Sequence, residues 1–255
     1  MKHKFIIGIL ILLIISCKKT ELEKRQNCGS NCTIVKGRFF SSNNEPVAGV
    51  KITCTYSIYK GWLSGTEVRE VFKTETDKDG NFYQSFYVKD DELGYNRQAG
   101  FEVEIDDSPL DGNKYIRSNN PPSSVTNVLT FLIDPINRRD TVMERNYFIP
   151  NKAFIKVNLN NFNPIKSDDY FEVETLYPFG QNVGYNKFLD SPYATGSNGW
   201  GTFRASGLNS LISVYVAENE KNIVRIKKRK NSINSYEDIP IFIPKNNNIE
   251  LTYNY

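Results

Sequence analysis

Paired carboxylates are the residues whose type and spacing most directly suggest chemistry in this sequence. Two carboxyl groups on either side of a sugar can hydrolyse a glycosidic bond, one as acid and the other as base or nucleophile. These pairs lie where we expect strands to end, and acids there commonly cap turns and keep sheet edges soluble. A histidine-free carboxylate glycosidase is therefore the weakest alternative, and no catalytic pair is named. The pairs are Asp90-Asp91-Glu92, Asp106-Asp107 and Asp168-Asp169.

Composition excludes histidine chemistry from the mature chain. His3 is the only histidine among 255 residues, and it lies in a segment that we expect to be removed. Without an imidazole there is no Ser-His-Asp or Cys-His catalysis, no histidine-ligated zinc and no histidine pH switch. The formal net charge of +3 is too small to indicate a nucleic-acid partner. We expect no enzyme activity and no cofactor.

The aromatic residues of two loops are the candidate ligand-binding groups. Trp62 and Trp200 are the only tryptophans, and both are flanked by glycine. An exposed indole can stack on a sugar face, although burial as a loop anchor is the commoner outcome. Tyr185 and Tyr193 lie with Trp200 in a loop-rich region, 178–200, which we expect to form a ligand surface.

One dense basic run is a candidate contact for an anionic surface. On a strand, Arg225, Lys227 and Arg229 would share one face. They could meet anionic lipid headgroups or acidic polysaccharide. The alternative is a charged edge strand that resists aggregation.

Residues 1–16 have the pattern of a secretory signal peptide. Lys2 and Lys4 precede an apolar run, 5–15, that is too short to cross a membrane as a helix. The motif Ile14-Ile15-Ser16-Cys17 resembles the lipobox of bacterial lipoproteins. That resemblance implies cleavage before Cys17, acylation of Cys17 and a membrane-anchored place in a Gram-negative cell envelope. We expect the outer membrane, with its periplasmic and surface faces both open, and a polar tether over residues 17–32.

Three further cysteines lie in this oxidising compartment. Cys28 and Cys32 precede the first expected strand, and Cys54 lies inside the second. Three thiols without histidine do not favour a metal site. An odd number allows one internal bridge. We expect a Cys32–Cys54 or Cys28–Cys54 disulfide, since a Cys28–Cys32 bridge would close only a tiny loop.

The body of the chain has β patterning throughout. Residues 101–106, 153–159 and 249–254 alternate apolar and polar side chains, which indicates half-buried strands. The nearly continuous apolar run 211–217 indicates a central strand, followed by a hairpin turn at 218–222 into 223–230. We expect an all-β fold of two tandem β-sandwiches, divided at Pro150-Asn151 into residues 33–149 and 150–255.

The first of these domains resembles a known family. Gly37-Arg38-Phe39-Phe40, Glu45-Pro46-Val47-Ala48-Gly49 and Thr76-Asp77-Lys78-Asp79-Gly80-Asn81-Phe82 are similar to the pattern of carboxypeptidase regulatory-like domains. The resemblance implies a transthyretin-like, Ig-like sandwich without catalytic residues. Asp77 is expected to cap a turn, Gly80 to take a left-handed conformation and Phe82 to re-enter the core.

These observations lead to one functional expectation with an alternative. We expect a non-catalytic, lipid-anchored envelope protein that acts as a binding, adhesion or scaffolding module. The alternative is a carbohydrate-binding accessory protein of a glycan-uptake system. The expected partners are the membrane, through the acyl chains, and an outer-membrane protein or a glycan.

Overall fold

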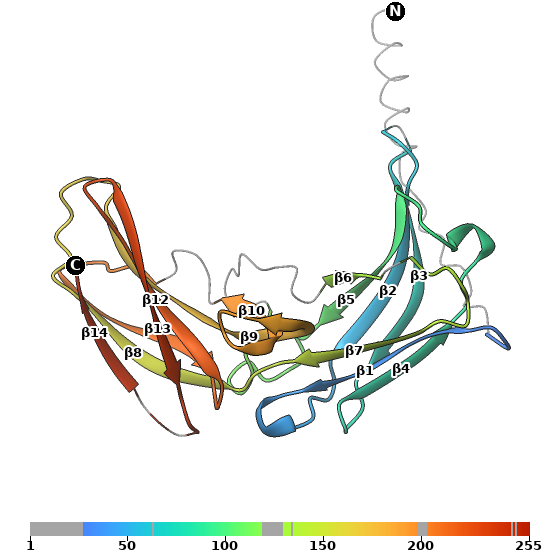
Figure 1. Cartoon of the computed structure of the whole chain (residues 1–255), viewed down its shortest axis with the longest axis horizontal. Coiled ribbons are helices and arrows are strands. Elements are labelled where there is room, and N and C mark those ends of the chain that lie inside the picture. The colour runs from blue at the N-terminus through green and yellow to red at the C-terminus, as the bar shows by residue number, and fades with distance from the viewer. Residues whose placement is uncertain are drawn as a thin grey trace, which may run out of the picture.

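The computed structural model describes residues 28–255 except 63, 119–129, 134, 198–202, 246 and 248. Within these residues the fold is all-β, as the alternating patterns predict, with short 3-10 turns at η1 (Ser42–Asn44) and η2 (Asp90–Glu92) (Figure 1). The expected signal peptide, Cys17 and Trp200 lie outside the described residues. No helix in the described part of the chain has the length and apolar character to cross a membrane.

The strands follow one another with short connections. In chain order they are β1 (Thr33–Phe40), β2 (Lys51–Tyr59), β3 (Thr66–Glu75), β4 (Asn81–Phe86), β5 (Ala99–Asp106), β6 (Thr130–Leu132), β7 (Val142–Phe148), β8 (Lys152–Asn160), β9 (Tyr170–Asn186), β10 (Ser191–Ser197), β11 (Asn209–Ala217), β12 (Lys221–Lys230), β13 (Ile233–Phe242) and β14 (Ile249–Asn254).

A long sheet and two smaller ones arrange the described strands. The seven-stranded sheet has the order β13-β12-β9-β7-β1-β4, with β10 paired to β9. The order β3-β2-β5-β6 makes a four-stranded sheet, and β11-β8-β14 makes a three-stranded one. The four-stranded sheet lies at one end of the molecule and the three-stranded sheet at the other (Figure 1).

Alternate side chains of the first half meet in one core. Val35, Phe39 and Tyr147 of the seven-stranded sheet pack with Ile52 and Val103 of the four-stranded sheet, all almost fully buried. The Phe39 and Tyr147 rings are stacked with their centroids 4.6 Å apart. Burial of each large apolar side chain of this kind contributes about 1.5–3 kcal/mol.

The turn between β3 and β4 has the geometry that its sequence predicts. Asp77 Oδ1 accepts hydrogen bonds from the backbone N–H groups of Asp79 and Asn81, at 2.9 and 2.8 Å. Gly80 has a φ of +75°, and Phe82 is buried in the core. These local features are therefore confirmed, whereas membership of the carboxypeptidase regulatory-like family stays a prediction.

A second core lies between the three-stranded sheet and the β9-β12 part of the long sheet. It contains Ile155 and Leu159 of β8, Phe171 of β9, Val214 of β11 and Ile226 of β12, all buried. The alternating patterns of 153–159 and 249–254 correspond to β8 and β14, which pair in parallel.

Two predictions about β11 are wrong. The apolar run 211–217 is not a central strand, because β11 lies at the edge of the three-stranded sheet and Leu211 is 61% exposed. The turn after it leads to β12 in the other sheet, so the two strands form no hairpin. An apolar run shows that side chains can be buried, but it does not fix a strand's position in a sheet.

The two halves of the molecule share the long sheet. β7 and β9 pair antiparallel at Tyr147–Gln181 and Phe148–Gly180. Tyr193 of β10 stacks on Phe148 with centroids 4.9 Å apart. Four side chains beyond residue 150 belong to the first core: Tyr177, Phe179, Tyr215 and Ala217. The expected domain boundary at 149/150 stays a prediction, and the structure has extensive contacts across it.

Polar groups also connect the halves. Ser42 Oγ donates a hydrogen bond to the Glu218 carbonyl at 2.7 Å. Ser42 also lies by the Glu220 carboxyl, which is near Tyr193. Burial at this junction raises the pKa of the Glu220 carboxyl to about 7, partly offset by its hydrogen bond with Ser42.

Two glycines with almost the same φ allow packing to be separated from backbone strain. A Cβ on Gly80 would lie 2.2 Å from the Phe39 carbonyl oxygen, whereas a Cβ on Gly49 (φ +78°) meets nothing within 4 Å. We expect Gly49→Ala to lower the free energy of unfolding by about 1 kcal/mol, and Gly80→Ala by about 3 kcal/mol. Urea denaturation of the two variants measures this difference, and equal losses would contradict the close approach.

The raised pKa of Glu220, which lies between the two halves, leads us to expect that stability depends on pH. The folded-state pKa of Glu220 lies above its ordinary value of 4.5, so its contribution is present below about pH 4.5 and is lost as the pH rises through about 7. We expect Glu220→Gln to lose less unfolding free energy than the parent between about pH 5 and about pH 8. Urea denaturation at both pH values tests this, with Glu67→Gln on the exposed hairpin as the control. Identical pH profiles for Glu220→Gln and the parent would count against a buried carboxyl.

Candidate binding surfaces

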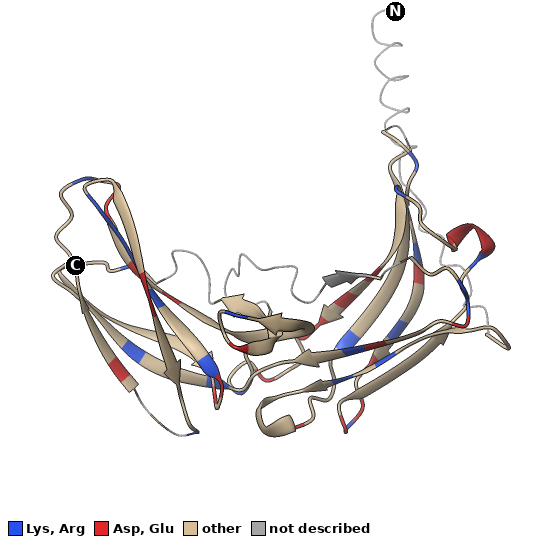
Figure 2. Cartoon of the chain, in the orientation of Figure 1, with Lys and Arg blue, Asp and Glu red and all other residues tan. Residues whose placement is uncertain are grey.

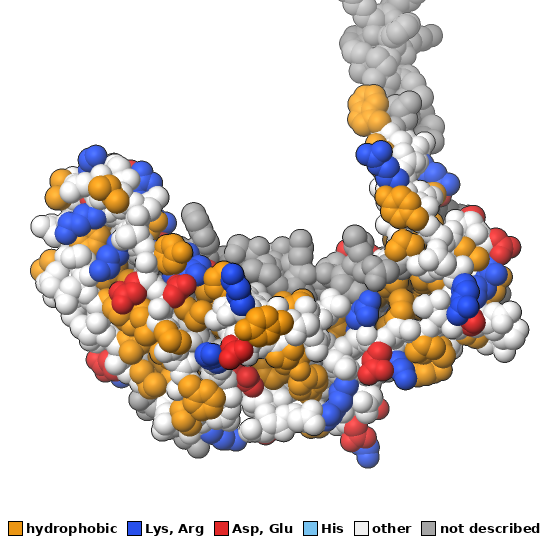
Figure 3. Space-filling view, in the orientation of Figure 1, with side chains coloured by type: hydrophobic (Ala, Val, Ile, Leu, Met, Phe, Trp, Pro, Cys, Tyr) orange, Lys and Arg blue, Asp and Glu red, His pale blue; other side chains and the backbone are white. Residues whose placement is uncertain are grey.

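The β2–β3 hairpin presents a nearly bare indole. Its turn is closed by backbone hydrogen bonds between Lys60 and Gly65 and between Gly65 and Gly61, both 2.8 Å, and both glycines have positive φ. Trp62 lies in this turn and is 90% exposed, while Tyr59 on the flanking strand is 44% exposed. The hairpin projects from the body, and hydrophobic side chains are visible at its end (Figure 3). Trp62 is therefore an exposed group, not a buried loop anchor.

The other predicted aromatic residues have different environments. Tyr185, at the end of β9, is 66% exposed, and its hydroxyl lies 3.4 Å from Asp190 Oδ1. Tyr193 packs between Phe148 and Phe40 at the junction, and burial raises the pKa of its hydroxyl. The β2–β3 turn and the β9–β10 pair lie apart (Figure 1). The described members of the set thus form no single site, and Tyr193 has a packing role.

The predicted basic face is present on β12, but its charges are paired. Arg225 makes two hydrogen bonds with Asp238, at 2.7 and 2.8 Å. Lys227 Nζ lies 2.6 Å from Glu174 Oε2, and Arg229 Nη2 lies 2.6 Å from Asp168 Oδ2. Acidic and basic segments are interspersed in the view of Figure 2. Because carboxylates neutralise all three cations, this face does not favour a site for anionic lipid. The alternative of a charged edge strand is wrong too, since β12 is paired on both sides, with β9 and β13.

The carboxylate pairs also have structural partners. Asp107 accepts hydrogen bonds from Ser118 N and Oγ at 2.7 and 2.8 Å, and Asp169 accepts two from the backbone of residues 165 and 166. Glu92 is almost fully buried and receives both donors of Arg69, at 2.8 and 2.5 Å. Among the residues that the structure describes, no group of three or more histidine, cysteine or acidic side chains is arranged to hold a metal ion.

The expected disulfide to Cys54 is wrong. Cys28 pairs with Cys32, with their Cα atoms 5.7 Å apart, and Cys54 is a free, fully buried thiol. Cys54 lies on the inward face of β2 between Phe72 of β3 and Val103 of β5. The other two cysteines precede β1, which belongs to the opposite sheet. β2, the strand that holds Cys54, is thus paired on both sides through core residues. The disulfide instead closes the short loop between Cys28 and Cys32.

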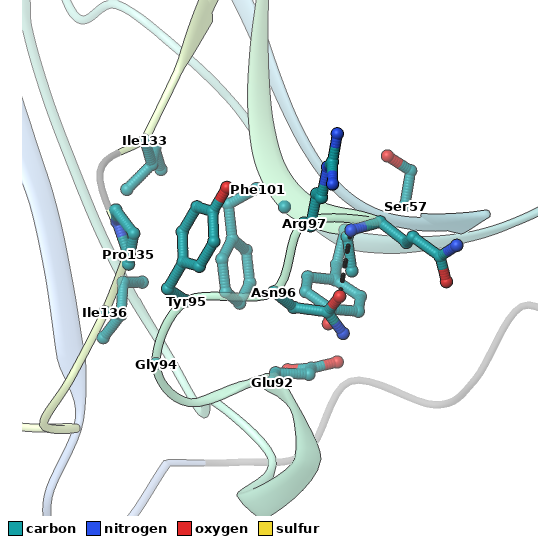
Figure 4. A pocket seen from close by; sticks show the side chains of 14 residues that line it. Ser57, Glu92, Gly94, Tyr95, Asn96, Arg97, Phe101, Ile133, Pro135 and Ile136 are labelled. Carbon is teal, nitrogen blue, oxygen red and sulfur yellow. Dashed lines mark hydrogen bonds between the residues drawn. The ribbon is translucent and has the colours of Figure 1, made fainter.

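A cleft that the sequence did not single out lies at the start of β5. It has a volume of about 460 Å³, and its floor is formed by the buried side chains of Phe101, Ile133 and Ile136. Tyr95, 79% exposed, and the exposed Arg97 belong to the loop that lines it (Figure 4). The sequence pattern that could have identified this loop is the one that identified Trp62, an aromatic residue beside a glycine. Here amide and guanidinium side chains follow the aromatic residue.

One carboxylate that lines the cleft is paired with an arginine. Glu92 lines it together with Tyr56, and both also line a smaller neighbouring hollow of about 180 Å³. Since the Arg69 guanidinium is held against Glu92, with its side chain 19% exposed, the negative charge of Glu92 is compensated within the wall.

Comparisons with known proteins give distant structural neighbours. No known protein family and no curated protein matches the sequence. The Bacillus anthracis TIE protein has a TM-score of 0.29 at 11% identity, and the match covers 88% of this chain and 33% of that protein. A Streptococcal ancillary pilin has a TM-score of 0.30 at 11% identity, covering 87% and 62%. The shaft pilin SpaA from Lactobacillus rhamnosus GG, as its D295N mutant, has 0.28 at 10%, covering 88% and 98%.

This chain thus spans about one third and somewhat under two thirds of the first two of these proteins.

The cysteine arrangement predicts a specific labelling pattern. In the folded, non-reduced protein we expect an alkylating reagent to modify none of Cys28, Cys32 and Cys54, because two are bridged and burial raises the pKa of the third thiol. After denaturation without reductant only Cys54 should react, and peptide mass spectrometry should find Cys28 linked to Cys32. A peptide that links Cys54 to either residue would overturn the assignment.

Proposed function

We propose that the protein is a membrane-anchored envelope lipoprotein whose β-sandwich body acts as a non-catalytic binding, adhesion or scaffolding module. The observation that carries the binding role is the Trp62 indole, 90% exposed at the turn of a projecting hairpin. Tryptophan is enriched among residues that dominate binding energy at protein interfaces, because it buries a large flat area. The anchoring part rests on the Ile14-Ile15-Ser16-Cys17 motif.

The architecture supports a scaffold that holds such a contact in place. Trp62 lies in the turn between β2 and β3, two strands of nine and ten residues that pair along their length. The long sheet joins that half to the rest of the body. The site is therefore carried on paired strands, and little order has to be gained on binding.

A carbohydrate-binding accessory protein is the second candidate. The cleft at the start of β5 favours it, because it combines an exposed aromatic ring with amide and guanidinium groups. A carboxylate glycosidase finds no support in the described pairs, because at least one carboxylate of each pair is engaged with backbone, serine or arginine donors.

In-cell cross-linking of the full-length tagged chain tests the proposed function. We expect acylation at Cys17 and a cross-link to an outer-membrane protein, which Trp62→Ala weakens about tenfold or more. Tyr83→Ala is the matched control, because Tyr83 is a 61% exposed aromatic residue on β4. Cys17→Ser should abolish both acylation and membrane recovery.

The outcomes separate the parts of this proposal. Membrane recovery of Cys17→Ser would overturn the anchor. The absence of any cross-link above background in the parent would count against the binding module. An undiminished cross-link in Trp62→Ala would remove the hairpin from the binding surface.

A further inference from the structure

We propose that the cleft at the start of β5 binds an acidic saccharide, with the sugar ring against Tyr95 and the carboxylate on Arg97. This proposal deepens the proposed binding function and rests on its carbohydrate-binding form. It assigns a ligand class to residues 94–98, which lie outside the aromatic loops singled out in the sequence.

The apolar part of the cleft suits the flat face of a sugar. The Tyr95 ring is 79% exposed, and its hydroxyl makes no hydrogen bond within the described part of the chain. In Figure 4 the ring stands between Phe101 and the side chains of Ile133, Pro135 and Ile136. The C–H groups of a pyranose can pack on such a ring, while its hydroxyls stay in contact with water and polar side chains.

The positive charge of the site comes from Arg97, which has no acidic partner among the residues that the structure describes. Arg97 makes no ion pair or hydrogen bond with the described residues, while every other arginine among them has at least one: Arg38, Arg69, Arg117, Arg138, Arg139, Arg145, Arg204, Arg225 and Arg229. A guanidinium is a planar fork that matches a carboxylate with two hydrogen bonds. Glu92 is the acidic side chain among the described residues that line the cleft, and because Arg69 already holds it, it does not compete for Arg97.

Polar groups on the same loop complete the lining. The side chains of Asn96, Gln98 and Ser57 border the cleft. Asn96 Oδ1 accepts the Gln98 backbone N–H at 2.9 Å, which leaves the Asn96 amide NH₂ as a donor. Amide donors and a hydroxyl match the vicinal hydroxyls of a sugar.

The loop that carries these groups is fixed at both ends. The Gly94 N–H donates to the Ile136 carbonyl at 2.9 Å, and the Tyr59 N–H donates to the Gln98 carbonyl at 2.8 Å. Gly94 has a φ of +81°, which directs the chain into the loop. Tyr95 and Arg97 are thus held on a short, tied segment, and this lowers the entropy lost on binding. A volume of about 460 Å³ lies within the usual range for small-ligand sites, so it accommodates one or two sugar units.

Matched sugar probes test the assignment. The full chain in detergent is titrated with methyl glucuronide and methyl glucoside, which differ by the carboxylate, and binding is followed by ligand-observed NMR. We expect a Kd of about 1 mM for the glucuronide and about tenfold weaker binding of the glucoside. Arg97→Gln should remove this difference, and Tyr95→Ala should weaken binding of both probes about fivefold.

The controls separate a local effect from loss of fold or of net charge. Both substituted side chains are exposed, so the variants should keep the parent's unfolding midpoint. Lys156→Gln removes one positive charge from the exposed side of β8 and should leave both titrations unchanged. Equal binding of the two probes, or a glucuronide affinity unaffected by Arg97→Gln, would overturn the acidic ligand class.

No binding of either probe at about 20 mM would overturn the saccharide site altogether. If the cross-link at Trp62 persisted in that case, the binding-module function would stand without this cleft.

Discussion

The pairing of β7 with β9 is the constraint on which the rest of the structure depends. It extends over only two residue pairs, yet it makes one sheet out of strands from both halves. The Tyr193–Phe148 stack and the four side chains that enter the first core reinforce it from the sides. The relative placement of the two halves is therefore determined by buried contacts and backbone hydrogen bonds, and a flexible linker does not separate them.

This rigid body explains where recognition chemistry is found. Charged groups on the strands are mostly paired, as Arg225 with Asp238 and Arg69 with Glu92 show. The two most exposed aromatic groups described in the first half lie instead at connections, Trp62 in the β2–β3 turn and Tyr95 before β5. Strands supply position and loops supply contact, which is the usual division in binding modules built on β-sheets.

The sequence predicted local structure better than long-range arrangement. Alternation located β5, β8 and β14, and the Asp77–Gly80 turn followed from its own residues, since both signals are local. The place of β11 at a sheet edge and the free thiol of Cys54 depend on which strands pair, and no local pattern encodes that. The same limit applies to the cleft, because Tyr95 and Arg97 become a candidate site only where Ile133 and Ile136 form its floor.

The parallel pairings have a consequence for the order of folding. β1 pairs in parallel with β7, more than a hundred residues later, and β8 pairs in parallel with β14 near the end of the chain. Because synthesis starts at the N-terminus, β1 and then β8 lack these partners until much later segments of the chain have been made. Contacts of such long sequence separation slow folding and leave strand edges exposed in the meantime. The edges of β1 and β8 that the finished fold pairs with β7 and β14 are thus the last to be covered as the protein folds.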